Sequence, residues 1–120
     1  MLAKGQEHLG SAEALFEQGR YRDAVSRAYY AAFSAMQGYV GPPPKGKWEH
    51  PGLRGASIGK LRAEGKTIEQ CRELRKRLRF LHSAREDADY TAGSIDERTA
   101  QEAIQLAQEV LALVQGGKQA

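Results

Sequence analysis

Cysteine is nearly missing from the sequence: Cys71 is the only one, so no disulfide within a single chain can stabilise the fold. A lone thiol is typical of proteins from reducing compartments. Long apolar runs are missing too, because even the stretch around residues 29–33 falls far short of the roughly 20 residues that cross a bilayer. Charged residues interrupt residues 1–16, which argues against a secretory signal. We therefore expect a cytoplasmic protein with no membrane segment.

Metal-binding patterns are also missing. The histidines, His8, His50 and His82, are scattered, and no two have the four-residue spacing that places ligands on one helical face. We expect no bound metal and no cofactor. Strand-like alternation, internal repeats and glycine-rich phosphate loops do not occur either. With 120 residues, of which 41% are hydrophobic, the chain is long enough to build one core. The prediction is a single domain over residues 1–120.

What the sequence does contain is helical periodicity, with apolar residues at three- and four-residue steps. It predicts helices over residues 2–18, 21–39 and 53–63, a fourth that begins at Thr67 and breaks near Gly93, and a fifth that stops at residues 116–117. The segment 41–52, rich in proline and glycine, is predicted to be a flexible loop, and residues 116–120 a tail. Short connections favour antiparallel neighbours. The expected fold is all-α, an up-and-down bundle of four main helices plus a short helix, with no sheet.

Two of these helix starts carry the pattern of a capping box. Thr67 is followed by Gln70, and Ser94 by Glu97. In such a box the hydroxyl accepts from a free backbone amide, and the longer side chain returns a hydrogen bond to the first residue.

Arg85 is the residue that fits the core pattern least. It extends the apolar stripe of residues 71–81 by one further four-residue step, although arginine is rarely buried unless it is paired. Asp89 lies four residues on, on the same face of a continuing helix, and Tyr90 follows it. Two interpretations remain open: an ion pair that closes the end of the helix, or an anion site at a groove or a dimer interface.

Positive charge is concentrated in the same helix. Between Arg72 and Arg85 there are six cations and one anion, Glu73, in a chain with a net charge of +3. Such a patch attracts phosphates, and a solvated helix face explains it equally well. Arg77 and His82 resemble the arginine/histidine pair of RNA-cutting helical toxins. Five positions, however, correspond to a rotation of about 140° in an α-helix, so the two side chains do not share a face.

The second predicted helix carries polar residues among its alanines. Arg27, Tyr29 and Tyr30 interrupt the small side chains. Packing between helices is the favoured interpretation of Tyr30, since a tyrosine buries its ring and offers its hydroxyl to a partner. Stacking on a base or ribose is the alternative.

Several of these segments together resemble a known family. Residues 27–31, Arg-Ala-Tyr-Tyr-Ala, resemble the second helix of prokaryotic HEPN proteins (higher eukaryotes and prokaryotes nucleotide-binding). Residues 50–53, His-Pro-Gly-Leu, are similar to the entry of that family's next helix, and residues 85–90 to its Arg-x-x-Ala-Asp-Tyr element. Order and spacing agree over residues 9–114. The resemblance implies a helical bundle that forms homodimers and often acts beside a minimal nucleotidyltransferase, as a toxin–antitoxin pair.

The resemblance also implies where chemistry would occur. Many members are metal-independent ribonucleases with an arginine followed by a histidine four to six residues later, at the dimer cleft. Arg85 matches the arginine, but no histidine follows at that spacing, so the expected general base is missing. We therefore expect nucleotide or RNA binding by Arg85, Asp89 and Tyr90, with Arg27, Tyr30 and His50 as further lining residues. The alternatives are a ribonuclease that uses Arg85 with His82 or His50 from the other subunit, and a non-catalytic dimerising scaffold.

Overall fold

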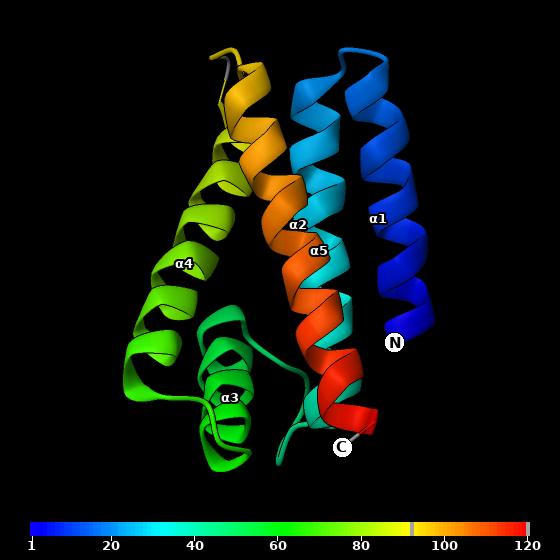
Figure 1. Ribbon diagram of the computed structural model, residues 1–120. Coiled ribbons are helices and arrows are strands. Elements are labelled where there is room, and N and C mark those ends of the chain that lie inside the picture. The colour runs from blue at the N-terminus through cyan, green and yellow to red at the C-terminus, as the bar shows by residue number, and fades with distance from the viewer. Residues whose placement is uncertain (92, 120) are drawn as a thin grey trace.

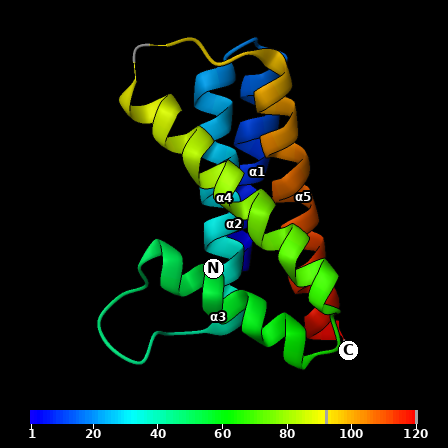
Figure 2. The same cartoon turned by 90° about the vertical axis from the view of Figure 1, so that its left-hand side faces the viewer.

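The computed structural model describes residues 1–91 and 93–119, with side chains described as far as Gln115. Five helices make up most of this part of the chain: α1 (Leu2–Glu17), α2 (Tyr21–Val40), α3 (His50–Ala63), α4 (Ile68–Tyr90) and α5 (Glu97–Gln119). Helices α1, α2, α4 and α5 alternate in direction, and the shorter α3 packs across one end of the bundle (Figure 1; Figure 2). No described residue lies in a strand. The predicted all-α bundle is confirmed.

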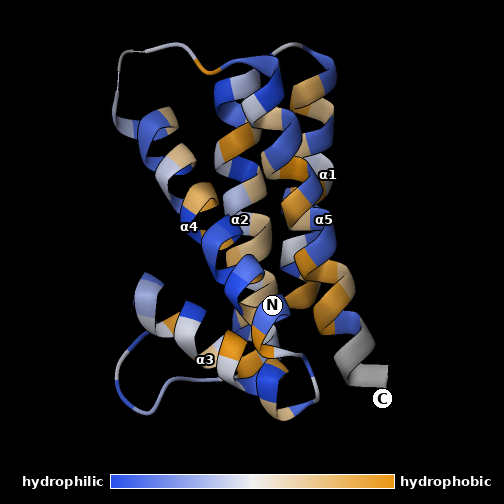
Figure 3. Cartoon of the chain, turned by 60° about the vertical axis from the view of Figure 1, so that its left-hand side comes forward, coloured by the Kyte–Doolittle hydropathy of each residue, from blue (hydrophilic) through white to orange (hydrophobic). Residues whose placement is uncertain are grey.

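Helix α2 is the centre of the bundle, because it packs against each of the other four helices. Its alanines are fully or almost fully buried, and their small side chains let α1 approach closely. The approach is closest at Gly5 of α1, where a Cβ atom would lie only 2.9 Å from the carbonyl oxygen of Ala31. Apolar residues gather on α2 and α5, whereas α4 is largely hydrophilic (Figure 3). The core therefore lies along α2, and α4 covers it with one narrow apolar stripe.

Helix α3 begins at His50, earlier than predicted. Pro51 lies in its first turn, where the missing amide hydrogen has no intrahelical partner to lose. The proline–glycine pair was therefore wrongly interpreted as part of the loop, which ends at Glu49. The indole of Trp48 donates to the carbonyl of Gly41 over 2.8 Å and joins the two ends of this loop. This earlier start makes His50 a helical residue.

The start of α4 is the predicted capping box. The amide of Gln70 donates to the Thr67 hydroxyl over 3.1 Å, and the amide of Thr67 donates to the Gln70 side chain over 2.9 Å. The second predicted box, from Ser94 to Glu97, is wrong. The Asp96 carboxylate instead accepts the amide of Thr99 over 2.8 Å, and α5 begins at the residue after Asp96. Aspartate caps a helix as well as serine does, so both patterns fitted this stretch.

Helix α5 also runs further than predicted. It continues through residues 116–117 to Gln119, although two glycines were expected to stop it. A glycine in a helix costs about 1 kcal/mol relative to alanine, which weakens the helix without breaking it. Ala120, the end of the predicted tail, lies outside the described residues. Over residues 1–91 and 93–119, no helix combines the length and the apolar character needed to cross a membrane.

Candidate functional site

Arg85 lies on α4 where the apolar stripe of that helix reaches the edge of the core. Its side chain is 8% exposed, and Nη1 lies 3.5 Å from Asp89 Oδ2 and 3.4 Å from the Tyr90 hydroxyl. Both distances are long for charge-assisted hydrogen bonds. The Nε atom is buried and has no hydrogen-bond partner among the described residues. The local ion pair is therefore present but leaves donors of the guanidinium free for another acceptor.

Three tyrosine rings surround this guanidinium. The central carbon of Arg85 lies 4.9 Å from the ring centre of Tyr29, 5.6 Å from that of Tyr30 and 5.8 Å from that of Tyr90. These distances are within the range of cation–π attraction. Burial acts to lower the pKa of Arg85, but the tyrosines and Asp89 outweigh it and leave the pKa above its ordinary value. Burial raises the pKa of Tyr29 to about 12, despite the neighbouring guanidinium. The site is thus a permanent cation among neutral phenols.

His50 and His82 join the site on the ring of Tyr29. Their imidazoles stack with centres 5.0 Å apart and planes 20° apart. The ring centre of Tyr29 lies 5.5 Å from that of His50 and 5.7 Å from that of His82, and the Tyr29 hydroxyl contacts Nδ1 of His50. Because Arg85 contacts the same tyrosine, the structure brings both predicted histidines next to the predicted arginine within one chain. The hypothesis that a histidine must come from a second subunit is therefore unnecessary.

Arg54 adds a further cation to this cluster. Its Nη1 lies 3.5 Å from Nδ1 of His82, and the Glu86 carboxylate lies 3.7 Å from the other nitrogen of that ring. Burial lowers the pKa of His50, and the charges of His82, Arg85 and Arg54 lower it further. Burial also lowers the pKa of His82, where Arg54 and Arg85 act with it and Glu86 opposes it. Both imidazoles are therefore mainly neutral at pH 7 and able to accept a proton when an anion arrives.

Arg27 and Tyr30 line a neighbouring open groove of about 640 Å³ between α1, α2 and the end of α4. Asp89 and His8 line it as well, and Nη1 of Arg27 lies 3.4 Å from Nδ1 of His8. The hydroxyl of Ser26 donates to Asp89, which in turn faces Arg85. The predicted residues thus fall into two adjoining groups, and Arg85 touches both.

Arg22 is a positioning residue that sequence reasoning missed. Its Nη1 donates to the carbonyl of Asp87 over 3.1 Å and to that of Thr91 over 3.0 Å, and its guanidinium also bonds the carbonyls of Ala88 and Gly93. These carbonyls lie at or just beyond the end of α4, where the last turn of a helix lacks intrahelical donors. Arg22 therefore fixes the turn that carries Asp89 and Tyr90. Nothing in the sequence distinguished it from the other arginines.

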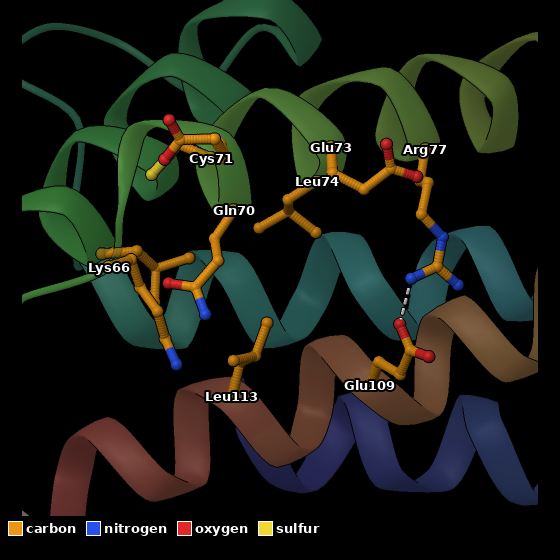
Figure 4. A pocket seen from close by; sticks show the side chains of 10 residues that line it. Lys66, Gln70, Cys71, Glu73, Leu74, Arg77, Glu109 and Leu113 are labelled. Carbon is orange, nitrogen blue, oxygen red and sulfur yellow. Dashed lines mark hydrogen bonds and ion pairs between the residues drawn. The ribbon is translucent and has the colours of Figure 1, made fainter.

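Arg77 takes no part in the site. It pairs with Glu109 of α5, across a second groove of about 410 Å³ that is largely apolar (Figure 4). The pattern from Arg77 to His82 therefore does not form an arginine/histidine pair. The groove itself contains none of the predicted site residues. Within the described part of the chain, no three His, Cys, Asp or Glu side chains come close enough together to hold a metal ion.

The fold and the site define a class of all-helical domain in which a buried, incompletely paired arginine is surrounded by tyrosines and histidines. A comparison with protein-family models supports this, since the HEPN domain matches residues 1–117. The chain belongs to the HEPN family, which associates it in general terms with nucleotides and RNA. No individual curated protein matches the chain.

Proposed function

We propose that this HEPN domain binds a phosphate group of a nucleotide or an RNA at Arg85. One observation carries the proposal: a buried guanidinium whose Nε has no partner and whose contacts to Asp89 and Tyr90 are long. A buried charge with unused donors costs stability. A phosphate oxygen would supply the missing acceptor through a strong, charge-assisted hydrogen bond.

The surrounding residues have distinct roles in this proposal. Asp89 and Tyr90 orient the guanidinium, and the stacked His50 and His82 offer protons to an arriving anion. The rings of Tyr30 and Tyr90 are 38% and 75% exposed, so they are available to stack on a base. Arg27 lines the adjoining groove, where it would contact a further part of the ligand.

The biological setting is part of the same proposal. The domain would act in the cytoplasm as a homodimer and as the partner of a minimal nucleotidyltransferase, in a pair of the toxin–antitoxin type. Family membership supports this setting. A nucleotidyltransferase gene next to the gene for this chain, and a complex of the two proteins on co-expression, would be the supporting results.

Calorimetric titration with AMP tests binding at Arg85. We expect Arg85→Gln to weaken binding by about 10-fold or more, since a hydrogen bond to a charged group contributes about 1.5–3 kcal/mol. Arg98→Gln is the matched control, because the Arg98 side chain is 87% exposed on α5. Arg85→Lys keeps the charge without the planar fork and should bind at an intermediate level. Circular dichroism of each variant establishes that it is folded.

Two outcomes would contradict nucleotide binding. Equal affinities for Arg85→Gln and Arg98→Gln would place the nucleotide elsewhere. No binding by the wild-type protein, alone and with its partner enzyme, would favour a non-catalytic dimerising scaffold in which the pair of Arg85 and Asp89 only fixes geometry.

Metal-independent RNA cleavage is the second candidate function. The observation in its favour is the stacked pair of His50 and His82 beside Arg85, because neutral imidazoles act as general bases near pH 7. Incubation of the purified protein with total RNA, in the presence of a chelator, tests it against Arg85→Ala and His50→Asn. Cleavage that persists in Arg85→Ala, or no cleavage by the wild-type protein, would exclude this activity at the site.

A further inference from the structure

Four cations form a row on the outward face of α4. Arg72, Arg75, Lys76 and Arg79 are all exposed, and their three- and four-residue spacing places them on one side of the helix. The row is about 10 Å long, at 1.5 Å per residue. Arg77, which lies off the row, is the arginine that pairs with α5. The hydrophilic character of α4 in Figure 3 includes this face.

The row is unpaired and repels itself. Each member has two like-charged neighbours three or four residues away, an arrangement that destabilises a helix. None of the four forms an ion pair with another residue of the described chain. A merely solvated helix face is expected to mix both signs of charge. The row therefore offers four free cations to an external anion and contributes nothing to the fold.

The row points toward the Arg85 site. Eighteen residues, or about five full turns, separate Arg72 from Tyr90, so Tyr90 lies on the same line of the helix about 27 Å away. The ring of Tyr90 is 75% exposed, while its hydroxyl lies 3.4 Å from Arg85. Glu86, which flanks this line, lies beside His82 at 3.7 Å. A ligand lying along the row would thus reach an exposed aromatic ring and then the buried guanidinium.

We propose that this row binds the sugar–phosphate backbone of a single-stranded nucleic acid whose end reaches Arg85. A free nucleotide carries its phosphates at one point and cannot contact both the row and Arg85, whereas a strand carries one phosphate per residue. Charged groups at neighbouring helical positions are about 5–6 Å apart, which suits successive phosphates of an extended strand. The exposed ring of Tyr90 favours a single strand, because only an unpaired base stacks on an aromatic side chain. The part of the proposal that ends at Arg85 rests on the function proposed above.

Fluorescence anisotropy with a labelled oligoribonucleotide of about ten nucleotides, over a series of salt concentrations, tests the row. The row variant is Arg72→Gln/Lys76→Gln/Arg79→Gln. The control variant, Lys45→Gln/Lys47→Gln/Arg98→Gln, loses the same charge from exposed positions elsewhere. Each phosphate contact with a single strand contributes about 0.7 to the slope of log affinity against log salt concentration. We expect the row variant to lose about 2 from this slope, and the control variant to keep it.

Titration of the same variants with AMP separates this proposal from the one at Arg85. The row variant should bind AMP as the wild type does, and Arg85→Gln should lose AMP while keeping most of the salt slope for RNA. Loss of AMP binding in every protein, with the row-dependent slope intact, would sink only the Arg85 site.

The row proposal is overturned if the row and control variants weaken RNA binding equally. It is also overturned if polyglutamate of matched charge binds as tightly as RNA and loses affinity in the row variant. That second result would assign the row to an acidic protein partner.

Discussion

Arg85 shows how one side chain can serve both the fold and a ligand. An arginine kept only for its ion pair would be expected to hold Asp89 at a short distance. Instead the pair is 3.5 Å apart, and the other oxygen of Asp89 accepts the hydroxyl of Ser26. Among the described residues, Arg85 is also the only charged one that is buried. The guanidinium is held in place mainly by three tyrosine rings, which leave its donors free.

The two stacked histidines make the stability of the protein depend on pH. Burial and nearby cations lower the pKa of His50 and of His82 below 6.5, the value of an unfolded chain. The unfolded state therefore binds more protons below about pH 6.5, and the free energy of unfolding must fall as the pH falls through this value. Above about pH 7.5 neither state is protonated at these rings, and their contribution is constant.

Urea unfolding between about pH 5.5 and 8 measures this effect. We expect the wild type to lose stability toward the acid end, and His50→Asn/His82→Asn to lose less over the same range. Arg54, Arg85, Glu49 and Glu86 are the charged groups that act on these rings. They do not titrate in this range unless perturbed, so the difference between the two curves isolates the histidines. Identical slopes for the two proteins would contradict the assignment.

At the scale of the helices, the sequence predicted what depends on periodicity and missed what depends on capping. The apolar stripe of α4 and the box of Thr67 with Gln70 were readable, since both follow from local spacing. The starts of α3 and α5 were not, because Pro51 fits either a loop or a first turn, and Asp96 caps as well as Ser94. The contact between Arg22 and the end of α4 joins residues far apart in the chain, which no local pattern encodes.

The same limit applies to the site. Arg85, Asp89 and Tyr90 were found because they share one helix face. Their meeting with His50 needed the crossing of α2, α3 and α4. Arg54 was missed because α3 was started too late: from His50, Arg54 is four residues on and shares its face.

The cation row of α4 should cost stability. Removing Arg72, Lys76 and Arg79 abolishes all four like-charged neighbour pairs of the row, each destabilising by about 0.2–0.5 kcal/mol. We expect the row variant to be more stable than the wild type by about 1 kcal/mol in urea unfolding at low salt, and the gain to shrink at high salt. A loss of stability in this variant would mean that the row supports the fold.

The close contact of α1 with α2 depends on Gly5. Gly5→Ala should destabilise the protein by about 1–3 kcal/mol, because the new Cβ would lie 2.9 Å from a backbone oxygen that cannot move freely. Gly10 lies on the same helix with nothing within 4 Å of its added Cβ. Gly10→Ala should therefore stabilise by about 0.5–1 kcal/mol through helix propensity alone. Thermal unfolding of both variants gives the comparison, and the same sign for both would refute the close packing.

For the molecule as a whole, the proposed function needs two copies. Tyr30, Phe80 and Tyr90 are large apolar side chains that remain exposed in the single chain, and exposed aromatic residues are enriched at interfaces between subunits. Sedimentation equilibrium should give twice the 13.2 kDa mass of one chain. A mass of 13.2 kDa that persists at high protein concentration would remove the dimer from the account.

The overall arrangement places the site where three helices meet. Helix α2 supplies the tyrosines, α3 supplies His50 and Arg54, and α4 supplies Arg85 and the row of cations. Because α2 packs on every other helix, the tyrosines are fixed by the core itself. The bundle is thus a rigid support, and the charged face of α4 is the part that varies most from what the fold alone requires.

The most direct test of the central claim is the ¹H–¹⁵N NMR signal of the Nε–H group of Arg85, assigned by its loss in Arg85→Lys. The account predicts that AMP shifts this signal and slows its exchange with water, because the buried Nε–H gains a phosphate acceptor. If AMP binds and shifts other signals while this one stays unchanged, Arg85 does not hold the phosphate, and the account is wrong.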